Sequence, residues 1–199
     1  MSSEFSLVFA SRNPNKLVEI SSALPNYVSV KSLSDAGIIE ELPETSGTIS
    51  GNAAQKALYV WQAIGANALA DDSGLEVVAL GDRPGVDSAF FAGVPRNDAR
   101  NMMYLLDQME GILDRRASFV TVIALVLGGE LRLFEGRIHG RIAERPLGSN
   151  GFGYDPVFIP EGYQDTFGQL PAAVKQSISH RARAVSVLRE YLDSLGADH

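Results

Sequence analysis

The fold class follows from the stretch Leu7–Leu24, which reads LVFASRNPNKLVEISSAL. Its first four residues are an apolar run of the kind that forms a buried strand. Asn13 suits a helix N-cap and Pro14 the first helical position, and apolar residues then recur at helical spacing from Leu17. The stretch therefore predicts a strand, a tight loop and an amphipathic helix, which is how an α/β protein begins.

The same alternation of apolar runs and helical periodicity continues along the chain. It predicts strands at residues 28–33, 68–70, 75–80, 119–127, 130–137 and 156–159, and helices at residues 50–66, 97–109 and 179–195. Gly128 and Gly129 suit a tight hairpin turn, because both can take a positive φ. We expect one α/β domain, residues 1–199, with a mixed β-sheet flanked by helices.

The composition is that of an acidic globular protein without cysteine. The 199 residues include 17 Lys and Arg against 24 Asp and Glu, a formal net charge of −7, so broad nucleic-acid binding is disfavoured. The absence of Cys excludes disulfides, thiolate zinc sites and cysteine nucleophiles. The most apolar run, Phe119–Leu127, which includes Thr121, is far shorter than the about 20 residues of a membrane-spanning helix. Ser2, Ser3 and Glu4 do not begin a secretory signal, so we expect a cytoplasmic protein with neither a membrane nor a nucleic-acid partner.

Basic residues stand where the local electrostatics disfavour them. Lys16 falls in the first turn of its predicted helix, where the macrodipole costs a cation about 0.3–1 kcal/mol, and His180 and Arg181 begin the last helix. Free backbone donors at helix N-termini bind phosphate, and a basic side chain beside them adds counter-charge. Lys56, one helical turn after Asn52, is a further candidate. Two such ends indicate a polyphosphate ligand, and solvated basic side chains are the alternative.

An acidic motif, Asp71–Gly74 (DDSG), follows the predicted strand at residues 68–70. Ligands of open α/β sheets bind at the carboxyl ends of strands, and neighbouring carboxylates there can hold Mg²⁺. Glu44, in an earlier acidic stretch, offers a further oxygen. A simple turn is the alternative, since Asp, Ser and Gly all form turns. The metal site is favoured because a polyphosphate pocket also needs a divalent cation to neutralise charge.

A glycine-rich stretch, Gly148–Asp155 (GSNGFGYD), places Phe152 and Tyr154 two residues apart, hence on one side of an extended chain. An aromatic ring there can stack on a base, and glycines let a ligand approach the backbone closely. The stretch matches neither a Walker A motif nor the dinucleotide fingerprint. An aromatic core flanked by turn glycines is the alternative.

Five segments, in order and at similar separations, resemble the inosine/xanthosine triphosphate pyrophosphatase family, whose members hydrolyse deaminated purine nucleoside triphosphates to monophosphate and pyrophosphate. They are Ser11–Lys16 (SRNPNK), Asn52–Ala57 (NAAQKA), Ala70–Leu75 (ADDSGL), Gly151–Pro156 (GFGYDP) and Ser177–Arg181 (SISHR). The resemblance spans essentially the whole chain. It implies an elongated mixed β-sheet flanked by helices, two lobes around a central cleft, a homodimer and a Mg²⁺ requirement.

The resemblance also implies roles, residue by residue. Asp72 resembles the family's catalytic carboxylate, which also belongs to the metal site, with Asp71 beside it. The implied substrate contacts near the triphosphate are Ser11, Arg12, Asn13, Pro14, Asn15, Lys16, Lys56 and Ser73. The groups implied to stack on and read the purine are Phe152, Gly153, Tyr154, Asp155, Lys175, His180 and Arg181.

Two positions depart from the pattern of the family. Gly51 stands where relatives commonly carry Glu, which bears on metal coordination and makes Glu44 the substitute, and Phe90 stands where they commonly carry Arg. We predict an enzyme that uses Mg²⁺ to hydrolyse ITP, dITP and XTP to nucleoside monophosphate and pyrophosphate. The alternatives are a pyrophosphatase acting on another nucleotide, as in the related septum-inhibitor family, and a catalytically silent nucleotide sensor.

Overall fold

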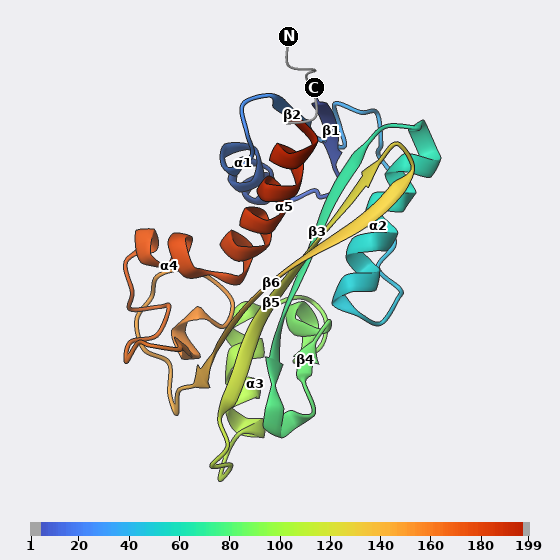
Figure 1. Cartoon of the computed structure of the whole chain (residues 1–199). Helices are drawn as coiled ribbons and strands as arrows, with labels where there is room; N and C mark the ends of the chain where they lie inside the picture. The colour runs from blue at the N-terminus through green and yellow to red at the C-terminus, as the bar shows by residue number, and fades with distance from the viewer. Residues whose placement is uncertain (1–4, 197–199) are drawn as a thin grey trace. The chain divides into compact units, whose positions relative to one another are not determined.

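The computed structural model describes residues 5–196, which form an α/β fold with one mixed β-sheet flanked by helices (Figure 1). In this part of the chain seven strands take part, in the order β2-β1-β3-β5-β6-β7 with β4 paired to β3. The strands are β1 (Phe5–Phe9), β2 (Val28–Lys31), β3 (Ala68–Val77), β4 (Arg83–Gly85), β5 (Arg116–Leu127), β6 (Glu130–Ile142) and β7 (Phe158–Pro160). The helices are α1 (Pro14–Ala23), α2 (Ile49–Ile64), α3 (Asp98–Gln108), α4 (Ala172–Ile178) and α5 (His180–Gly196), with 3₁₀ turns η1 (Val78–Leu80), η2 (Ser88–Phe90) and η3 (Asp155–Val157). The predicted fold class is confirmed.

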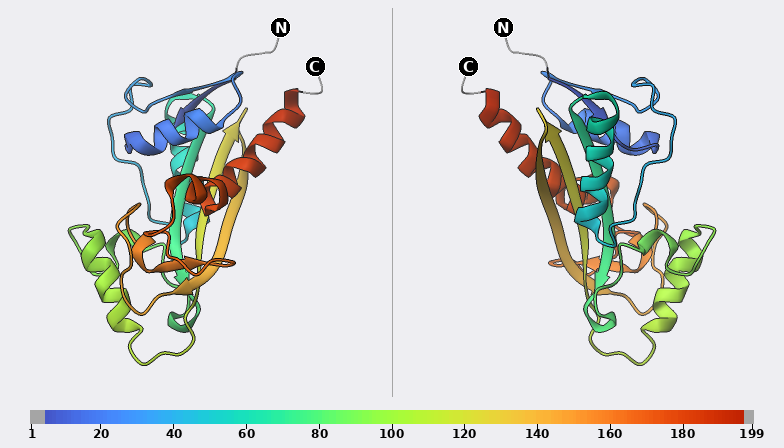
Figure 2. Two further views of the ribbon diagram at one scale, coloured as in Figure 1. Left: turned by 90° about the vertical axis from the view of Figure 1, so that its left-hand side faces the viewer. Right: turned by 90° about the vertical axis from the view of Figure 1, so that its right-hand side faces the viewer.

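The first of two compact units comprises the chain up to Asp72, the segment Thr121–Gly136 and the chain from Arg183 onward. Strand β1 runs parallel to β2 and to β3, with Val8 opposite Ala68. Helices α1 and α5 lie on one face of these strands and α2 lies on the other (Figure 2). The parallel register brings the loop after β1 and the middle of β3 to the same edge.

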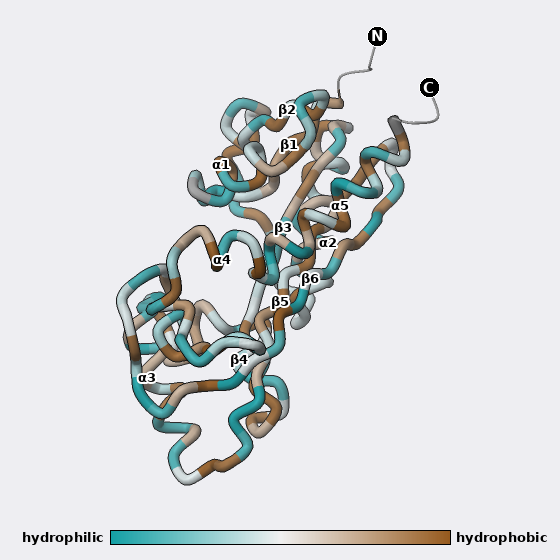
Figure 3. The backbone as a smooth tube through the Cα atoms, turned by 60° about the vertical axis from the view of Figure 1, so that its left-hand side comes forward, coloured by the Kyte–Doolittle hydropathy of each residue, from teal (hydrophilic) through white to brown (hydrophobic). Residues whose placement is uncertain are grey.

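Apolar side chains from β1, β3 and β5 form the core of this unit together with the inner sides of α1 and α5. Its buried members are Leu7, Phe9, Ile20, Leu24, Val28, Leu69, Ile123, Leu125, Phe134, Ala184, Val185, Leu188 and Leu192. Figure 3 shows the hydrophobic stretches along β1 and β5. Burying each large side chain contributes about 1.5–3 kcal/mol, so both ends of the loop after β1 are held firmly.

Helix α2 begins and ends where local chemistry requires it. The Thr48 side chain caps the N-terminus by accepting a hydrogen bond from the Gly51 amide at 3.0 Å, and Gly65 ends the helix at a φ of 66°. Ala53 and Ala57 are fully buried on its inner face. Lys56, between them on that side, is therefore directed into the protein and not toward solvent.

The second unit comprises Ser73–Val120 and Arg137–Ala182. Within it, β4 is antiparallel to the second half of β3 and β7 is antiparallel to the end of β6. The predicted helix at residues 97–109 is α3, whose N-cap Asn97 accepts a hydrogen bond from the Arg100 amide at 2.9 Å. The buried core of the second unit consists of Leu75, Val77, Leu105, Met109, Ala117, Phe119, Ile138, Ile142, Tyr154, Val157, Phe158, Phe167 and Leu170.

The predicted break between strands at residues 68–70 and 75–80 is wrong, because β3 runs without interruption from Ala68 to Val77, and the alternative of a simple turn at Asp71–Gly74 falls with it. Asp, Ser and Gly favour turns, but here they lie in a strand because the Asp71 side chain is buried and paired with Lys16. The hairpin turn is confirmed, with φ of 59° at Gly128 and 89° at Gly129. Helix α4 was not predicted, and none of the helices within residues 5–196 is long and apolar enough to cross a membrane.

Candidate functional site

Lys16 and Asp71 form a buried ion pair in the first unit. Lys16 lies in the first turn of α1, and its Nζ is 3.0 Å from Oδ1 and 2.9 Å from Oδ2 of Asp71. The Asp71 side chain is fully buried in β3, whereas a quarter of the Lys16 side chain is exposed. A buried carboxylate without a cation would be costly, so this pair fixes the ammonium group at the edge of the sheet.

Lys56 contacts oxygen atoms of three residues. Its Nζ lies 2.5 Å from Glu44 Oε1, 2.8 Å from the Asp71 carbonyl oxygen and 3.7 Å from Asp72 Oδ1. Its side chain is only 7% exposed, against 17% for that of Asp72 and 51% for that of Glu44. Asp71 and Asp72 are consecutive in a strand, so their side chains leave on opposite faces. Lys16, Glu44, Lys56, Asp71 and Asp72 are called the lysine–carboxylate cluster below.

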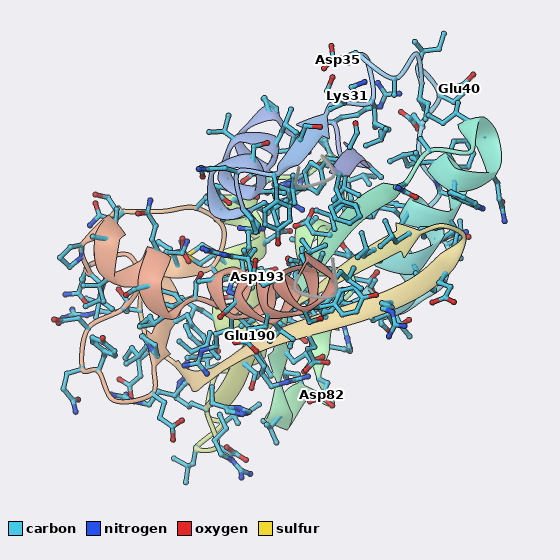
Figure 4. The ribbon with its side chains drawn as sticks, turned by 45° about the horizontal axis from the view of Figure 1, so that its top comes forward. Lys31, Asp35, Glu40, Asp82, Glu190 and Asp193 are labelled. Carbon is cyan, nitrogen blue, oxygen red and sulfur yellow. The ribbon has the colours of Figure 1, made fainter. Side chains whose placement is uncertain are left out.

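The loop before α2 delivers Glu44 to this cluster and is braced on both sides of it. Arg12 Nη2 donates to the carbonyl oxygens of Ile39 and Glu40, each at 2.5 Å. Figure 4 shows Glu40 on this loop. Thr45 and Gln55 exchange two hydrogen bonds, each of 2.9 Å. Sequence reasoning assigned Arg12 to the triphosphate and missed its hold on the loop, for which the sequence carries no signal.

The departure at Gly51 has a local structural reason. The Ser46 hydroxyl fills the space that a Cβ at position 51 would occupy. Ser46 donates to Asn52 Oδ1 from its amide at 3.1 Å and from its hydroxyl at 3.0 Å. Any side chain at position 51 would therefore displace Ser46 and loosen the segment next to Glu44.

The carboxylates of the first unit suit a hard divalent cation. Within residues 5–196 no three His, Asp or Glu side chains are grouped closely enough to hold a metal by themselves. Mg²⁺, however, is usually bound by one or two carboxylates together with waters and substrate phosphates. Glu44 and Asp72 each lie within ion-pair range of the Lys56 ammonium group, so both carboxylates are close to one cation. The donor set therefore fits Mg²⁺ that arrives with a polyphosphate.

The remaining residues predicted near the phosphates lie in the loop after β1, at the start of α1 and, for Ser73, in β3. Asn13 accepts a long hydrogen bond of 3.4 Å from the Lys16 amide, and its own amide donates to the Ser11 hydroxyl at 3.2 Å. Pro14 is the exposed first residue of α1. The Asn15 side chain lies outside the described part of the chain. Ser73 follows Asp72 in β3 and is half-buried.

A second polar group lies in the second unit. Lys175, on α4, is ion-paired with Asp155 Oδ2, and its Nζ lies 4.5 Å from the ring centroid of Phe152. Asp155 is buried and also accepts from the Phe152 amide at 2.7 Å. Burial raises the pKa of Asp155 above its ordinary value, with Lys175 acting in the opposite direction. Phe152, Asp155 and Lys175 are called the Phe152 cluster below.

Glycine makes the Phe152 cluster possible. A Cβ at Gly151 would overlap the Asp155 carboxylate, and the backbone there has a φ of 77°. Gly153, in contrast, has a φ of 61° with nothing within 4 Å of where its Cβ would be. The glycine-rich stretch was expected to let a ligand approach the backbone closely. At Gly151 the group that approaches the backbone is the Asp155 carboxylate of the same chain.

The expectation that Phe152 and Tyr154 share one side is wrong. Residues 151–154 form a bend and a turn and not an extended segment, and the two rings differ in burial. Phe152 is 57% exposed, whereas Tyr154 is 5% exposed and donates from Oη to the Ser88 carbonyl oxygen at 2.9 Å. Phe152 is thus the ring available to a base, and Tyr154 belongs to the core.

His180 and Arg181 begin α5, as predicted, directly after α4. His180 is buried and stacks on Phe119, with ring centroids 4.8 Å apart and planes at 13°. The Ser179 hydroxyl accepts from the Ala182 amide at 3.2 Å, so a side chain already caps this helix. Because this amide is already capped, it does not offer its hydrogen to a phosphate at this helix end. The side chains of the first turn are then available to contact other parts of a ligand.

Comparison with known proteins shows one family. The model of the Ham1 family matches residues 7–191. A dITP/XTP pyrophosphatase of Flavobacterium psychrophilum is 49% identical over 185 residues, which are 93% of this chain and 97% of that protein. The structure of the Staphylococcus aureus Ham1 protein has a TM-score of 0.90 at 36% identity, covering 95% of this chain and 98% of that one. A nucleoside-triphosphatase / dITP/XTP pyrophosphatase from Mycobacterium abscessus has a TM-score of 0.82 at 44% identity, covering 92% and 98%.

Proposed function

The chain belongs to the Ham1 family, and from that premise we propose that it hydrolyses deaminated purine nucleoside triphosphates. The substrates are ITP, dITP and XTP, and the products are the nucleoside monophosphate and pyrophosphate. The observation that carries the proposal is the meeting of Lys16, Lys56 and Asp72 around Asp71. Two lysines beside a partly exposed carboxylate are what a reaction at a phosphoanhydride requires.

The phosphates are bound at the start of α1. Lys16 Nζ donates to Asp71 Oδ1 and lies 2.9 Å from Oδ2, so an ammonium group with three N–H donors still has one for a phosphate oxygen. The loop from Ser11 to Asn15 and the first amides of α1 add backbone donors at the positive end of the helix. Lys56 adds positive charge nearby, and Ser73 lies next to the reacting carboxylate.

Asp72 acts as the general base. It accepts a proton from a water molecule whose oxygen forms a bond to the α-phosphorus, while the bond from that phosphorus to the bridging oxygen breaks and pyrophosphate leaves. Glu44 and Asp72 would hold Mg²⁺, which would neutralise charge on the phosphate oxygens, while Asp71 holds Lys16 beside them. The pairing of Asp71 with Lys16 and of Glu44 with Lys56 holds these groups in place before substrate arrives.

The Phe152 cluster and the start of α5 recognise the base. The exposed Phe152 ring stacks on the purine, and the backbone at Gly153 and Tyr154 shapes the turn that presents it. Lys175, His180 and Arg181 offer donors to the 6-oxygen of inosine or xanthosine, with Asp155 as the matching acceptor. Adenosine presents an amino group instead, and each buried donor left unpaired costs about 1–3 kcal/mol.

Product identification tests the proposal. The protein is incubated with ITP and MgCl₂, and phosphorus NMR identifies the products. We expect inosine monophosphate and pyrophosphate, whereas diphosphate with orthophosphate would overturn the proposal. A panel of other nucleotides distinguishes a pyrophosphatase with another preference, and a sensor would show thermal stabilisation by ITP without turnover.

Two further properties belong to the proposal. We place the enzyme in the cytoplasm, where the nucleotide pool is consumed by polymerases. We also propose a homodimer, which the resemblance to the pyrophosphatase family supports, with the exposed Phe90 as a contact candidate. Light scattering after size-exclusion chromatography tests the dimer, and a monomer mass at micromolar concentration would reject it.

A further inference from the structure

We propose that Asn150 is a site of spontaneous deamidation, and that this modification loosens the Phe152 cluster. The Gly151 amide nitrogen attacks Cγ of Asn150, so that a new carbon–nitrogen bond forms while the bond from Cγ to Nδ2 breaks. The amide proton passes to the departing nitrogen, which leaves as ammonia, and water opens the resulting succinimide to aspartate or isoaspartate. The modification is independent of the proposed function, and only its consequence for base recognition rests on it.

The sequence contains the reactive pair once. Among the 199 residues, Asn is followed by Gly only at Asn150 and Gly151. Glycine has no Cβ, so its backbone nitrogen is the least obstructed nucleophile that can follow Asn. Position 151 needs glycine, because its φ is 77° and a Cβ there would overlap the Asp155 carboxylate. The packing of the Phe152 cluster therefore keeps next to Asn150 the residue that permits attack on it.

Both reacting groups are accessible in the folded protein. Asn150 is exposed and lies outside helices and strands, and none of the described residues 5–196 accepts a hydrogen bond from the Gly151 amide. Asn52 and Asn101, in comparison, are buried within α2 and α3, where the next amide belongs to the helical hydrogen-bond ladder.

Asn150 is restrained by a hydrogen bond from its side chain. Its Nδ2 donates to the Leu170 carbonyl oxygen at 3.1 Å, near the upper end of the usual range for N–H···O bonds. Exposed side chains change rotamer within nanoseconds, whereas deamidation is far slower. The bond therefore slows the reaction without preventing it, because it opens and re-forms many times before Cγ reacts.

Asn150 also joins the two segments that build the Phe152 cluster. Its backbone amide donates to the Gly168 carbonyl oxygen at 2.9 Å, and its side chain donates to that of Leu170. Phe152 follows Asn150 on one segment, and Lys175 follows Leu170 on the other, with its Nζ 4.5 Å from the Phe152 ring centroid. The Asn150 side chain thus helps to set the position of the ammonium group over the ring.

Deamidation removes this tie. A carboxylate at position 150 has no hydrogen to donate, so a negatively charged oxygen would face the Leu170 carbonyl oxygen. Isoaspartate in addition inserts a carbon atom into the main chain directly before Gly151, where the Asp155 carboxylate already fills the space beside the backbone. Either product therefore separates the two segments and disturbs the surface offered to a base.

Ageing of the folded protein tests the modification. The protein is kept at mildly alkaline pH, which favours loss of the Gly151 amide proton, and its peptides are mapped by mass spectrometry beside a sample unfolded in guanidinium chloride. We expect the mass increase of an amide-to-acid conversion at Asn150 before any other asparagine, with aspartate and isoaspartate both present. An Asn150 that stays intact while the unfolded sample converts, or an earlier conversion elsewhere, would overturn the proposal.

Two matched substitutions test the consequence. Asn150→Asp creates one product directly, and Asn97→Asp makes the same change at an exposed position of the same unit, where Asp caps α3 as well as Asn does. We expect Asn150→Asp to lower the Tm by about 2–4 °C, the effect of one lost hydrogen bond in a chain of this length, and Asn97→Asp to leave it unchanged. Equal Tm values in the two variants would contradict the role of Asn150 as a tie.

Base recognition provides a further readout. Asn150→Asp should lower the ratio of kcat/KM for ITP to that for ATP about threefold or more, whereas Asn97→Asp should keep the wild-type ratio. An unchanged ratio in Asn150→Asp would contradict the link to base recognition. If the wild type hydrolyses neither nucleotide, the proposed function fails, and the peptide map and the Tm values still decide the modification.

Discussion

The lysine–carboxylate cluster and the Phe152 cluster contain the same pair, a lysine on a buried aspartate, but they are built differently. Lys16 stands on the ten-residue helix α1, and Asp71 stands on the strand β3. Lys175 stands on the short helix α4, and Asp155 begins a 3₁₀ turn reached through a glycine turn. The first pair is thus positioned by regular elements and the second by close packing around Gly151.

The comparison teaches how the two tasks of a nucleotide enzyme differ. Every nucleoside triphosphate carries the same phosphates, so the groups that bind them need one fixed position, which strand and helix ends provide. Bases differ by single polar groups, so a base reader needs a shaped surface, here the exposed Phe152 ring beside a paired Lys175. If this division is correct, changes in each cluster should affect separate properties.

The largest effect is expected at Asp72. Asp72→Asn removes the general base and should lower kcat about 10²- to 10⁴-fold, while ITP still stabilises the protein against thermal unfolding because the Phe152 cluster is intact. Asp82→Asn is the matched control, since Asp82 is an exposed aspartate whose φ of 63° suits Asn equally well (Figure 4). Full activity of Asp72→Asn would remove its assigned role.

The second prediction tests how the Phe152 cluster is built. Gly151→Ala combines a positive φ with overlap on Asp155, whereas Gly153→Ala has the positive φ alone. We expect Gly153→Ala to cost about 1 kcal/mol of unfolding free energy and Gly151→Ala to cost at least about 1 kcal/mol more. Chemical denaturation of the two variants measures this difference, and equal losses would show that the contact with Asp155 is unimportant.

The smallest effect concerns the ionisation of Asp155. Burial raises the pKa of Asp155 above its ordinary 3.8. At a pH between the ordinary and the raised pKa, the folded protein therefore keeps a proton that the unfolded chain has released. This group's contribution to the free energy of unfolding therefore falls as the pH rises through that window. Asp155→Asn lacks this slope and should gain stability relative to wild type as the pH rises. Parallel denaturation curves at all pH values would contradict the raised pKa.

Much of the lysine–carboxylate cluster was predictable because it lies on regular elements. The apolar run before Ser11 and the cap at Asn13 locate Lys16, and helical spacing puts Lys56 one turn after Asn52, although its burial was found only in the structure. Parallel pairing of β1 with β3 then brings Lys16 next to Asp71. These three features depend on local patterns and one general rule of sheet topology.

The parts that were missed depend on tertiary contacts. The strand through Asp71 exists because a lysine from α1 neutralises a buried carboxylate, which turn propensities do not contain. Arg12 holds backbone carbonyls, which every residue has, so no sequence pattern marks its partners. Tyr154 is buried because its hydroxyl finds the Ser88 carbonyl, and periodicity does not distinguish such a ring from the exposed Phe152.

The division between the two clusters is tested most directly by measuring kcat/KM for ITP and for ATP in Lys16→Met and Lys175→Met. Lys16→Met should lower both values by the same factor, about tenfold or more, and leave their ratio unchanged. Lys175→Met should lower the value for ITP and spare that for ATP, so that the ratio collapses. An unchanged ratio in Lys175→Met, or an altered one in Lys16→Met, would contradict the assignment of phosphates to one cluster and base to the other.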